Sequence, residues 1–402
     1  MHDCEVAFRK PEQSLDEAVA AMFESARKNE KSAPRKHHLI PASYLARWSL
    51  RGRIRVTEST SKHTYLTAPE KAARETDFYS LASADLDSHD IPPLLLETIL
   101  SRVEGTAKAT IEVLLQGGPA ALTLVDALGF AQFLAFQYVR GRAFREQLMA
   151  LSNAGMLKMW EGVTDEGIAA RLKQQGTDPT PEAVATMRKT LNEWKSGDLR
   201  IGPQPAAQAG YAAAAAEQIA LVFLARPWRI YHSAMPMITC DEPVVPVAGP
   251  RGNRRENAGL STAGVVLFPL DPHFLLAMFH PDLGLDEVAL YQELDPIEAD
   301  EINCELAAHS DRWLFEQPGR TRTLTLIVPP YPSSRAVLET INVVNRPEGE
   351  FLRGYSPTRW HQHPQPPPCP VNRWWETARV PGLHDFAFDT DKMPYALYNT
   401  LA

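Results

Sequence analysis

The sequence predicts an α+β fold, in which a mainly helical bundle core is flanked by a small N-terminal head containing a hairpin and by a C-terminal region of mixed strands and helices. Three patterns predict it. Apolar residues recur at helical spacing over residues 91–195, they alternate or form short runs after Arg226, and two alternating runs lie close together between residues 51 and 69. The chain has 402 residues, of which 44% are hydrophobic and 22% charged, so it can bury a substantial core.

Shifts in composition divide the chain into four parts. We expect an N-terminal helix and linker over residues 1–35, a histidine-motif head with the helical bundle over 36–225, an α+β region over 226–347, and an arm rich in proline and aromatic residues over 348–402. The last part contains HQHPQPPPCP, which favours an irregular or polyproline-like conformation laid over the body.

The first part of the chain predicts two helices and a hairpin. Ser14 is a good N-cap for an amphipathic helix that ends before the polar linker at residues 28–35. A short helix should start near Pro41, since proline suits the first helical turn. The runs RGRIRVTEST and KHTYLTAP then alternate between apolar and polar residues as paired strands do.

Five helices are expected next, over residues 91–116, 123–150, 166–175, 181–195 and 211–225. The sequence GGP at residues 117–119 stops the first, and Thr180-Pro181 provides N-cap chemistry for the fourth. The fifth is rich in alanine, and it is too short, and interrupted at Glu217, to span a bilayer.

Strands dominate after Arg226. The runs WRIYHSA, MITC, VVPVAG, GVVLFPL and HFLLAMF are strand-like and are separated by proline, glycine and aspartate. Asp295-Pro296 then starts a helix to about residue 308, and RWLFEQ and TLTLIVP predict two further strands.

The net charge and the absence of several known motifs disfavour particular classes of function. Lys and Arg number 41 and Asp and Glu 49, so the net charge of −8 gives no support for a nucleic-acid partner, which would need a local basic patch. The absence of P-loop, GxGxxG, GxSxG and HExxH motifs disfavours kinases, Rossmann dehydrogenases, elbow-type serine hydrolases and zincins. Four scattered cysteines, no signal peptide and no membrane-length segment predict a cytoplasmic protein with no membrane partner.

Adjacent histidines, His37 and His38, precede the proline of the short helix. Imidazole titrates near neutral pH, so one of them is a candidate general base or metal ligand. Neighbouring side chains on a strand point to opposite faces, so at most one faces a given cleft. The alternative is that both rings are hydrogen-bonded in the core beside Tyr44 and Trp48.

Two polar residues, Gln137 and Arg140, follow the helical spacing of the phenylalanines around them, so they lie on or beside an apolar stripe. An amide and a guanidinium need partners when they are buried. Glu97 and Glu104, seven residues apart on the preceding helix, are available. The pair Arg140–Glu104 is either purely structural or, if the carboxylates share a cavity with a histidine, part of a metal or acid/base site.

The sequence Cys240-Asp241-Glu242-Pro243 places two carboxylates at the end of an expected strand. A rigid strand aims such groups into a cleft, and we single out Asp241 as catalytic or metal-binding. Carboxylates at this position also form turns. Cys240 is either a nucleophile or, more commonly for its type, a small buried hydrophobe.

Taken in order, these motifs resemble the bacterial domain-of-unknown-function family numbered 4238 over residues 36–315. The family's opening, two histidines, a proline and then Tyr-Leu, is matched by HHLIPASYL, and FPLDP follows later. Its second signature is usually Ser-Asp-Asn-Pro, and here residues 240–243 replace the serine and the asparagine. The resemblance implies no established activity, but it groups the histidine pair, the helix carboxylates, Gln137, Arg140 and Asp241.

Three functions are compatible with these residues, and whether the chain is an enzyme stays open at this point. The first is a metal-dependent hydrolase of a phosphoester or nucleic acid, with catalysis by His37 or His38, Gln137 and Arg140. Its divalent metal ion would be held by His38, Glu97, Glu104 and Asp241. The second is a non-catalytic ligand-binding or sensor protein with a structural buried polar cluster. The third is a small-molecule tailoring enzyme that uses the same pocket.

Overall fold

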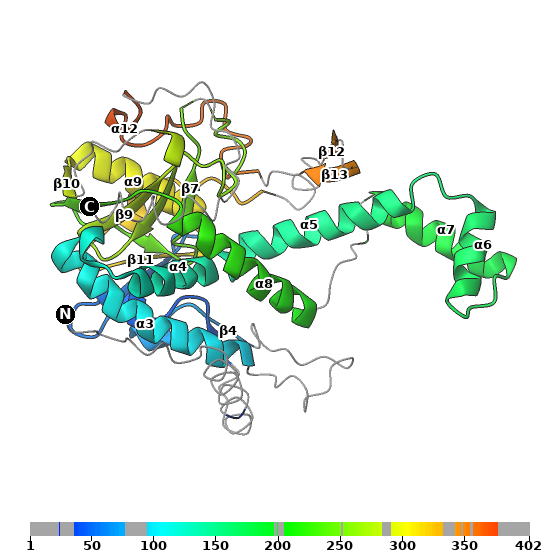
Figure 1. Ribbon diagram of the computed structural model, residues 1–402, viewed down its shortest axis with the longest axis horizontal. Coiled ribbons are helices and arrows are strands. Elements are labelled where there is room, and N and C mark those ends of the chain that lie inside the picture. Colours follow the sequence, from blue (N-terminus) through cyan, green and yellow to red (C-terminus); the bar gives the residue numbers. More distant parts are fainter. Residues whose placement is uncertain are drawn as a thin grey trace, which may run out of the picture.

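A computed structural model of the protein (Figure 1) describes residues 24, 36–76, 95–196, 199, 205–250, 252–283, 291–332, 342–346, 349–353 and 357–376. Apart from Glu24, which is helical, the helix expected within residues 1–35 lies outside the described residues.

The expected α+β mixture is present. The α-helices of the described residues are α2 (Ala42–Leu45), α3 (Leu95–Gly117), α4 (Leu124–Val139), α5 (Arg142–Met159), α6 (Asp165–Gln174), α7 (Pro181–Ser196), α8 (Pro205–Leu224), α9 (Pro296–His309), α10 (Arg322–Thr325) and α12 (Arg373–Glu376). Capping boxes at Thr123 and Asp295 explain where α4 and α9 begin, because in each the N-cap side chain and the third helical residue satisfy each other's backbone amides.

The largest sheet has five strands in the order β10-β5-β9-β8-β7. They are β10 (Tyr291–Leu294), β5 (Trp228–Ser233), β9 (Phe274–Phe279), β8 (Val265–Pro269) and β7 (Val245–Val247). Their pairing is antiparallel except between β10 and β5, which run parallel.

The N-terminal hairpin joins a second sheet, of order β3-β2-β11-β6. Its strands are β2 (Ile54–Glu58), β3 (Thr64–Thr67), β6 (Thr239–Cys240) and β11 (Trp313–Glu316). Head and C-terminal strands are therefore hydrogen-bonded to each other. Two further pairs are β1 (Lys36–His38) with β4 (Arg74–Thr76), and β12 (Asn342–Arg346) with β13 (Gly349–Arg353).

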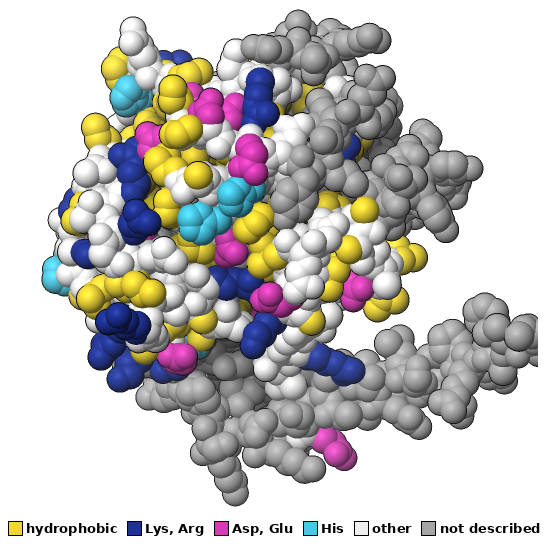
Figure 2. Space-filling model, turned by 90° about the vertical axis from the view of Figure 1, so that its left-hand side faces the viewer, with side chains coloured by type: hydrophobic (Ala, Val, Ile, Leu, Met, Phe, Trp, Pro, Cys, Tyr) yellow, Lys and Arg dark blue, Asp and Glu magenta, His cyan; other side chains and the backbone are white. Residues whose placement is uncertain are grey.

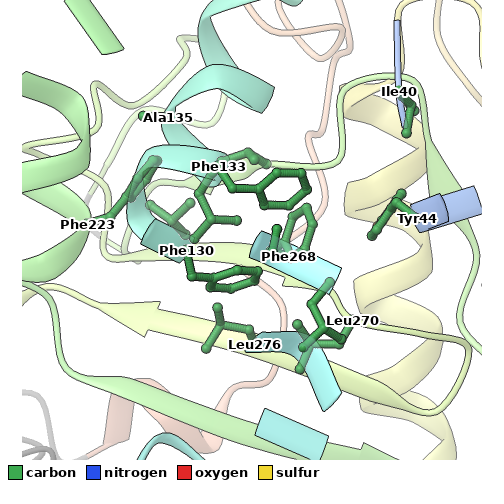
Figure 3. Packing of buried hydrophobic residues seen from close by; sticks show 14 of the residues in the cluster. Ile40, Tyr44, Phe130, Phe133, Ala135, Phe223, Phe268, Leu270 and Leu276 are labelled. Atoms are coloured by element: carbon green, nitrogen blue, oxygen red, sulfur yellow. The ribbon is translucent and has the colours of Figure 1, made fainter. Parts of the chain in front are cut away.

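The five-stranded sheet is covered on both faces, so the body has three layers. Residues of one face, including Phe268, pack with α4 and α8, and residues of the other face pack with α9 and α12. Figure 3 shows Phe130 and Phe133 of α4 meeting Phe268, with Tyr44 of α2 approaching from the other side. Because helices cover both faces of the sheet, side chains on both faces of β8 and β9 are buried. This explains why these two strands are apolar almost throughout.

Two expectations from the sequence are wrong. The single helix over residues 123–150 is two helices, because α4 ends at Val139 and α5 starts at Arg142 in a new direction. The strand expected at TLTLIVP begins instead with the helical turn α10, because the Glu316 carboxylate accepts hydrogen bonds from the amides of Arg322 and Thr323 and holds that turn.

Helices α5, α6 and α7 do not join the bundle but extend away from the body (Figure 1). Along α5 only Ala150 and Asn153 are buried. The outer end has its own small core of Ile168, Leu191 and Trp194. No helix within the described residues is long and apolar enough to cross a membrane.

Candidate functional site at the junction of two helices

Three of the residues singled out in the sequence form one buried cluster at the end of α4. Arg140 donates from Nη1 to Glu104 Oε1 at 2.9 Å and from Nη2 to Gln137 Oε1 at 2.6 Å. Arg140 is 4% exposed and Gln137 3%, whereas the Glu104 side chain is 25% exposed at the edge of α3. Glu104 and Gln137 are therefore the partners that the buried Arg140 guanidinium needs.

Two donors of this cluster remain unused. Gln137 Nε2 and Arg140 Nε have no hydrogen-bond partner within the described part of the chain. Both are N–H groups, so the group that would satisfy them is an acceptor, such as a water or carboxylate oxygen.

The histidine pair makes a different contact. Arg74 of β4 donates from Nε to His38 Nε2 at 3.0 Å, across the β1–β4 pair. The backbone of His37 lies in β1 and that of Glu97 in the first turn of α3, but their side chains lie outside what the structure describes.

Asp241 is a buried acceptor for the start of β11. Its Oδ1 accepts from the amide of Asp311 at 2.9 Å, and its Oδ2 from those of Arg312 at 2.7 Å and Trp313 at 2.9 Å. Burial raises the pKa of Asp241 to about 7, the nearby Asp311 carboxylate adds to this rise, and the three amide donors oppose it. Asp241 therefore fixes where two strands of the smaller sheet meet.

Glu242, the next residue, points to another element. Its Oε1 accepts from the amide of Ala143 at 3.0 Å, in the first turn of α5, and the Arg142 amide donates to it as well. Burial and the neighbouring charge of Asp241 raise the pKa of Glu242 to about 8. Adjacent carboxylates thus hold a strand and a helix, because successive side chains on an extended backbone diverge.

Gly141 allows this contact. A Cβ at Gly141 would lie 2.8 Å from Cδ of Glu242, so a side chain here and the glutamate cannot both keep their places. As the N-cap residue, Gly141 offers no side-chain oxygen to α5, and Glu242 supplies the missing acceptor.

Charged groups from other elements complete the junction. Asp311 pairs with Arg142 at 3.2 Å, and the buried Arg359 of the C-terminal segment donates to the backbone carbonyls of Ser310, Asp311 and Pro329. The Arg359 guanidinium also lies 5.0 Å from the ring centre of Tyr331.

A cavity of about 40 Å³ lies beside the junction. Its lining includes Ala143, Glu305, His309, Tyr331 and Arg359. Burial lowers the pKa of His309 to about 4, and the charge of Arg359 adds to the effect, so this imidazole is neutral near pH 7. The cavity is large enough for water or a small ion and too small for a nucleotide.

Reasoning from the sequence did not find Glu242, Asp311 and Arg359 as parts of this site. One signal was present for Glu242: the helix that starts after Gly141 lacks Ser, Thr, Asp or Asn at its N-cap, so its free amides need an acceptor from elsewhere. No signal in the sequence indicates which distant carboxylate fills that place.

The carboxylates expected to bind metal are engaged with protein groups. Asp241 accepts three amide bonds and Glu104 pairs with Arg140, so neither offers the open set of oxygens that a divalent ion needs. Among the described residues no group of three or more His, Cys, Asp or Glu side chains is arranged to hold a metal ion. The metal site that includes Glu97 stays a prediction.

Comparisons with known proteins agree with the resemblance in the motifs. Neither the search of curated proteins nor the search of solved structures finds a match. One family model matches residues 36–320, and its description is a protein of unknown function (DUF4238). Since that range covers most of the chain, the protein belongs to the DUF4238 family.

Proposed function

We propose that the protein is a non-catalytic sensor, in which the α4–α5 junction (residues 137–143) sets the attachment of the projecting helices α5–α7. The observation that carries the proposal is the hydrogen bond from the Ala143 amide to the buried Glu242 carboxylate. It links the strand layer of the body to the first turn of the first projecting helix. Helix starts are stabilised by such acceptors by about 1 kcal/mol.

Two features supply an input to this link. Glu242 is buried among ionisable groups from several elements. Gain or loss of a proton by Glu242 therefore changes the free energy of holding its side chain at the junction. These groups are Asp241 directly after β6, Asp311 before β11, Tyr138 on α4, and Tyr331 and Arg359. The small cavity also touches Ala143, so an ion or water that enters it contacts the same helix start.

The output would be the position of helices α5–α7. They have a separate core at their outer end, and Trp194 donates to Asn153 to tie α7 to α5. The three helices can therefore move as one unit if their base loosens. A partner protein that binds α5–α7 would detect such a movement.

The test uses a matched pair of variants. Glu242→Gln keeps an oxygen that can accept from Ala143 and cannot ionise, whereas Glu242→Ala removes the acceptor. We expect hydrogen exchange in residues 142–147 to rise about fivefold in Glu242→Ala, because about 1 kcal/mol of capping is lost, and to stay near the wild-type rate in Glu242→Gln. Equal exchange in all three proteins would contradict the proposal.

The competing hypothesis is a metal-dependent hydrolase of a phosphoester. The sensor proposal predicts instead that the junction holds no metal ion. Purified protein should carry no stoichiometric divalent metal at the junction, and any change of melting temperature with a chelator should be the same in the wild type and in Asp241→Asn. A chelator-sensitive melting temperature that Asp241→Asn abolishes would favour the hydrolase instead.

We also infer a cytoplasmic location. Cys240, Cys304 and Cys369 are free thiols, which fits a reducing compartment. The cavity beside Ala143 has room for water or a small ion, and a nucleic-acid partner has no support from the net charge of −8.

A further inference from the structure

Two histidines lie together at one end of the inner strands of the large sheet, away from the junction. His232 is in β5, and His273 directly precedes β9, the strand that pairs with β5. Their ring centres are 6.3 Å apart, and the two ring planes differ by 29°. Figure 2 shows histidine side chains at the surface of the face it presents, next to acidic ones.

Each imidazole is held at its Nδ1 atom. His232 Nδ1 lies 2.7 Å from Glu293 Oε2 on β10, and His273 Nδ1 lies 2.8 Å from the carbonyl oxygen of Ser233. Since both partners are acceptors, Nδ1 of each neutral ring carries the proton and Nε2 keeps its lone pair. A carboxylate or carbonyl behind Nδ1 is the usual support of a histidine that binds metal through its other nitrogen.

The backbone makes the pair rigid. The Ser233 amide donates to the carbonyl of His273 at 2.8 Å, so Ser233 and His273 are tied twice. The Asp271 carboxylate accepts from the amides of His273 and Phe274, and the ring of Phe274 lies 5.0 Å from that of His232. Binding of a ligand would therefore cost little conformational entropy at these residues.

The Nε2 atoms are accessible and close enough to share an ion. The His232 side chain is 34% exposed, and no described residue forms a hydrogen bond with Nε2 of either ring. A metal–nitrogen bond of about 2.1 Å places a ring centre about 3.2 Å from the metal, so two imidazoles on one ion have centres about 5.2 Å apart at the tetrahedral angle of zinc and about 6.4 Å apart when they bind on opposite sides. The observed 6.3 Å corresponds to nearly opposite nitrogens, an arrangement found in the square-planar and tetragonal sites of copper(II).

We propose that His232 and His273 form a binding site for copper(II). Their Nε2 atoms are the protein ligands, water completes the coordination, and Glu293 and the Ser233 carbonyl support the rings from behind. The choice of metal follows from the ligands and from their separation, since imidazole suits copper better than magnesium or calcium, and copper(II) accepts nitrogens on opposite sides.

The experiment is calorimetric titration of untagged protein with copper(II) chloride, repeated with zinc chloride, which should bind more weakly. We expect one ion per chain, and an affinity at least tenfold weaker in His232→Ala and in His273→Gln, which keeps a donor for the Ser233 carbonyl. Glu293→Gln should weaken binding about tenfold, because it removes the charged support behind His232. Each variant's melting temperature without metal shows whether the fold is intact.

The matched control is His361→Ala with His363→Ala, a second pair of histidines, in the C-terminal segment, that contact other groups. This control should bind copper(II) as the wild type does. The proposal is overturned if the wild type binds no more tightly than the His232→Ala, His273→Gln double variant, or if only the control loses binding.

Discussion

At the scale of single residues, the two adjacent buried carboxylates Asp241 and Glu242 act as acceptors for backbone amides. Asp241 accepts from three amides at the start of β11, and Glu242 from the start of α5. Such amides cannot be left unpaired in the interior, so a distant acidic side chain is retained to satisfy them. The same two residues carry raised pKa values because they are buried side by side.

Asp241→Ala should therefore destabilise the fold strongly. Three amides would lose their acceptor, and at about 1 kcal/mol or more for each we expect a loss of about 3 kcal/mol in the free energy of unfolding. Urea unfolding followed by circular dichroism measures this value. Asp178→Ala, in the exposed loop before α7, is the control and should change it by less than about 0.5 kcal/mol. A change no larger than that of the control would contradict the structural role of Asp241.

The pH dependence of stability follows from the same two groups. Their folded pKa values, about 7 for Asp241 and about 8 for Glu242, lie above the ordinary values, so the folded protein keeps protons that the unfolded chain has released. Their contribution is full below about pH 4 and is lost as the pH rises through 7 and 8. The free energy of unfolding should fall between pH 6 and 9, and fall less in Glu242→Gln. Identical curves for the two proteins would show that Glu242 does not titrate in this range.

Which residues can be found from the sequence depends on how far apart the partners lie along the chain. Arg140 and Gln137 were found because helical spacing alone shows that they lie on a buried face. Asp241 was found as a strand-end carboxylate, but its partners lie 70 to 72 residues later, and no local pattern encodes that contact. Glu242 was not singled out, and its partner Ala143 lies 99 residues earlier.

At the scale of elements, the break between α4 and α5 shows what local periodicity misses. Apolar residues continue at helical spacing across residues 139–144, so the sequence favours one helix. The tertiary contact with Glu242 instead starts a new helix at Arg142. The remaining long helices and the strands from β5 to β9 were predicted because their signals, capping residues and continuous apolar runs, are local.

Gly141→Ala tests this contact within the junction. The added methyl group would meet Glu242 Cδ at 2.8 Å, so we expect a loss of about 1 to 3 kcal/mol in the free energy of unfolding. The clash is absent when Glu242 is also alanine, and the double variant should lose less than the sum of the single losses. Additive losses would show that the two residues do not oppose each other.

Gly105→Ala is the matched control for that series. No atom lies within 4 Å of a Cβ at this exposed position of α3, and alanine favours a helix interior over glycine by about 0.5 to 1 kcal/mol. The control variant should be as stable as the wild type or slightly more stable.

At the scale of the whole molecule, the layered body and the projecting helices are separate packing units. The body is held by two large apolar clusters on the two faces of the sheet, whereas the outer end of the projection is held by Ile168, Leu191 and Trp194. A pattern of helices in the sequence does not show which of them bury their apolar faces against a common core, and this is why a bundle was expected where α5–α7 extend outward.

Ile168→Ala should show that the projecting helices unfold separately from the body. Ile168 is fully buried in the outer core, and its truncation removes about 2 to 5 kcal/mol from a cluster of only three buried residues. Because none of its packing partners belongs to the body, the loss should appear as local unfolding of α6 and α7. Limited proteolysis should cut faster within residues 160–196, while the main thermal transition of the body stays where it is in the wild type. Ile302→Ala, in α9 on the sheet, should instead lower that main transition, because its neighbours belong to the core of the body. If Ile168→Ala lowers the main transition as much as Ile302→Ala does, the projection and the body unfold together, and α5–α7 cannot respond to the junction as an independent unit.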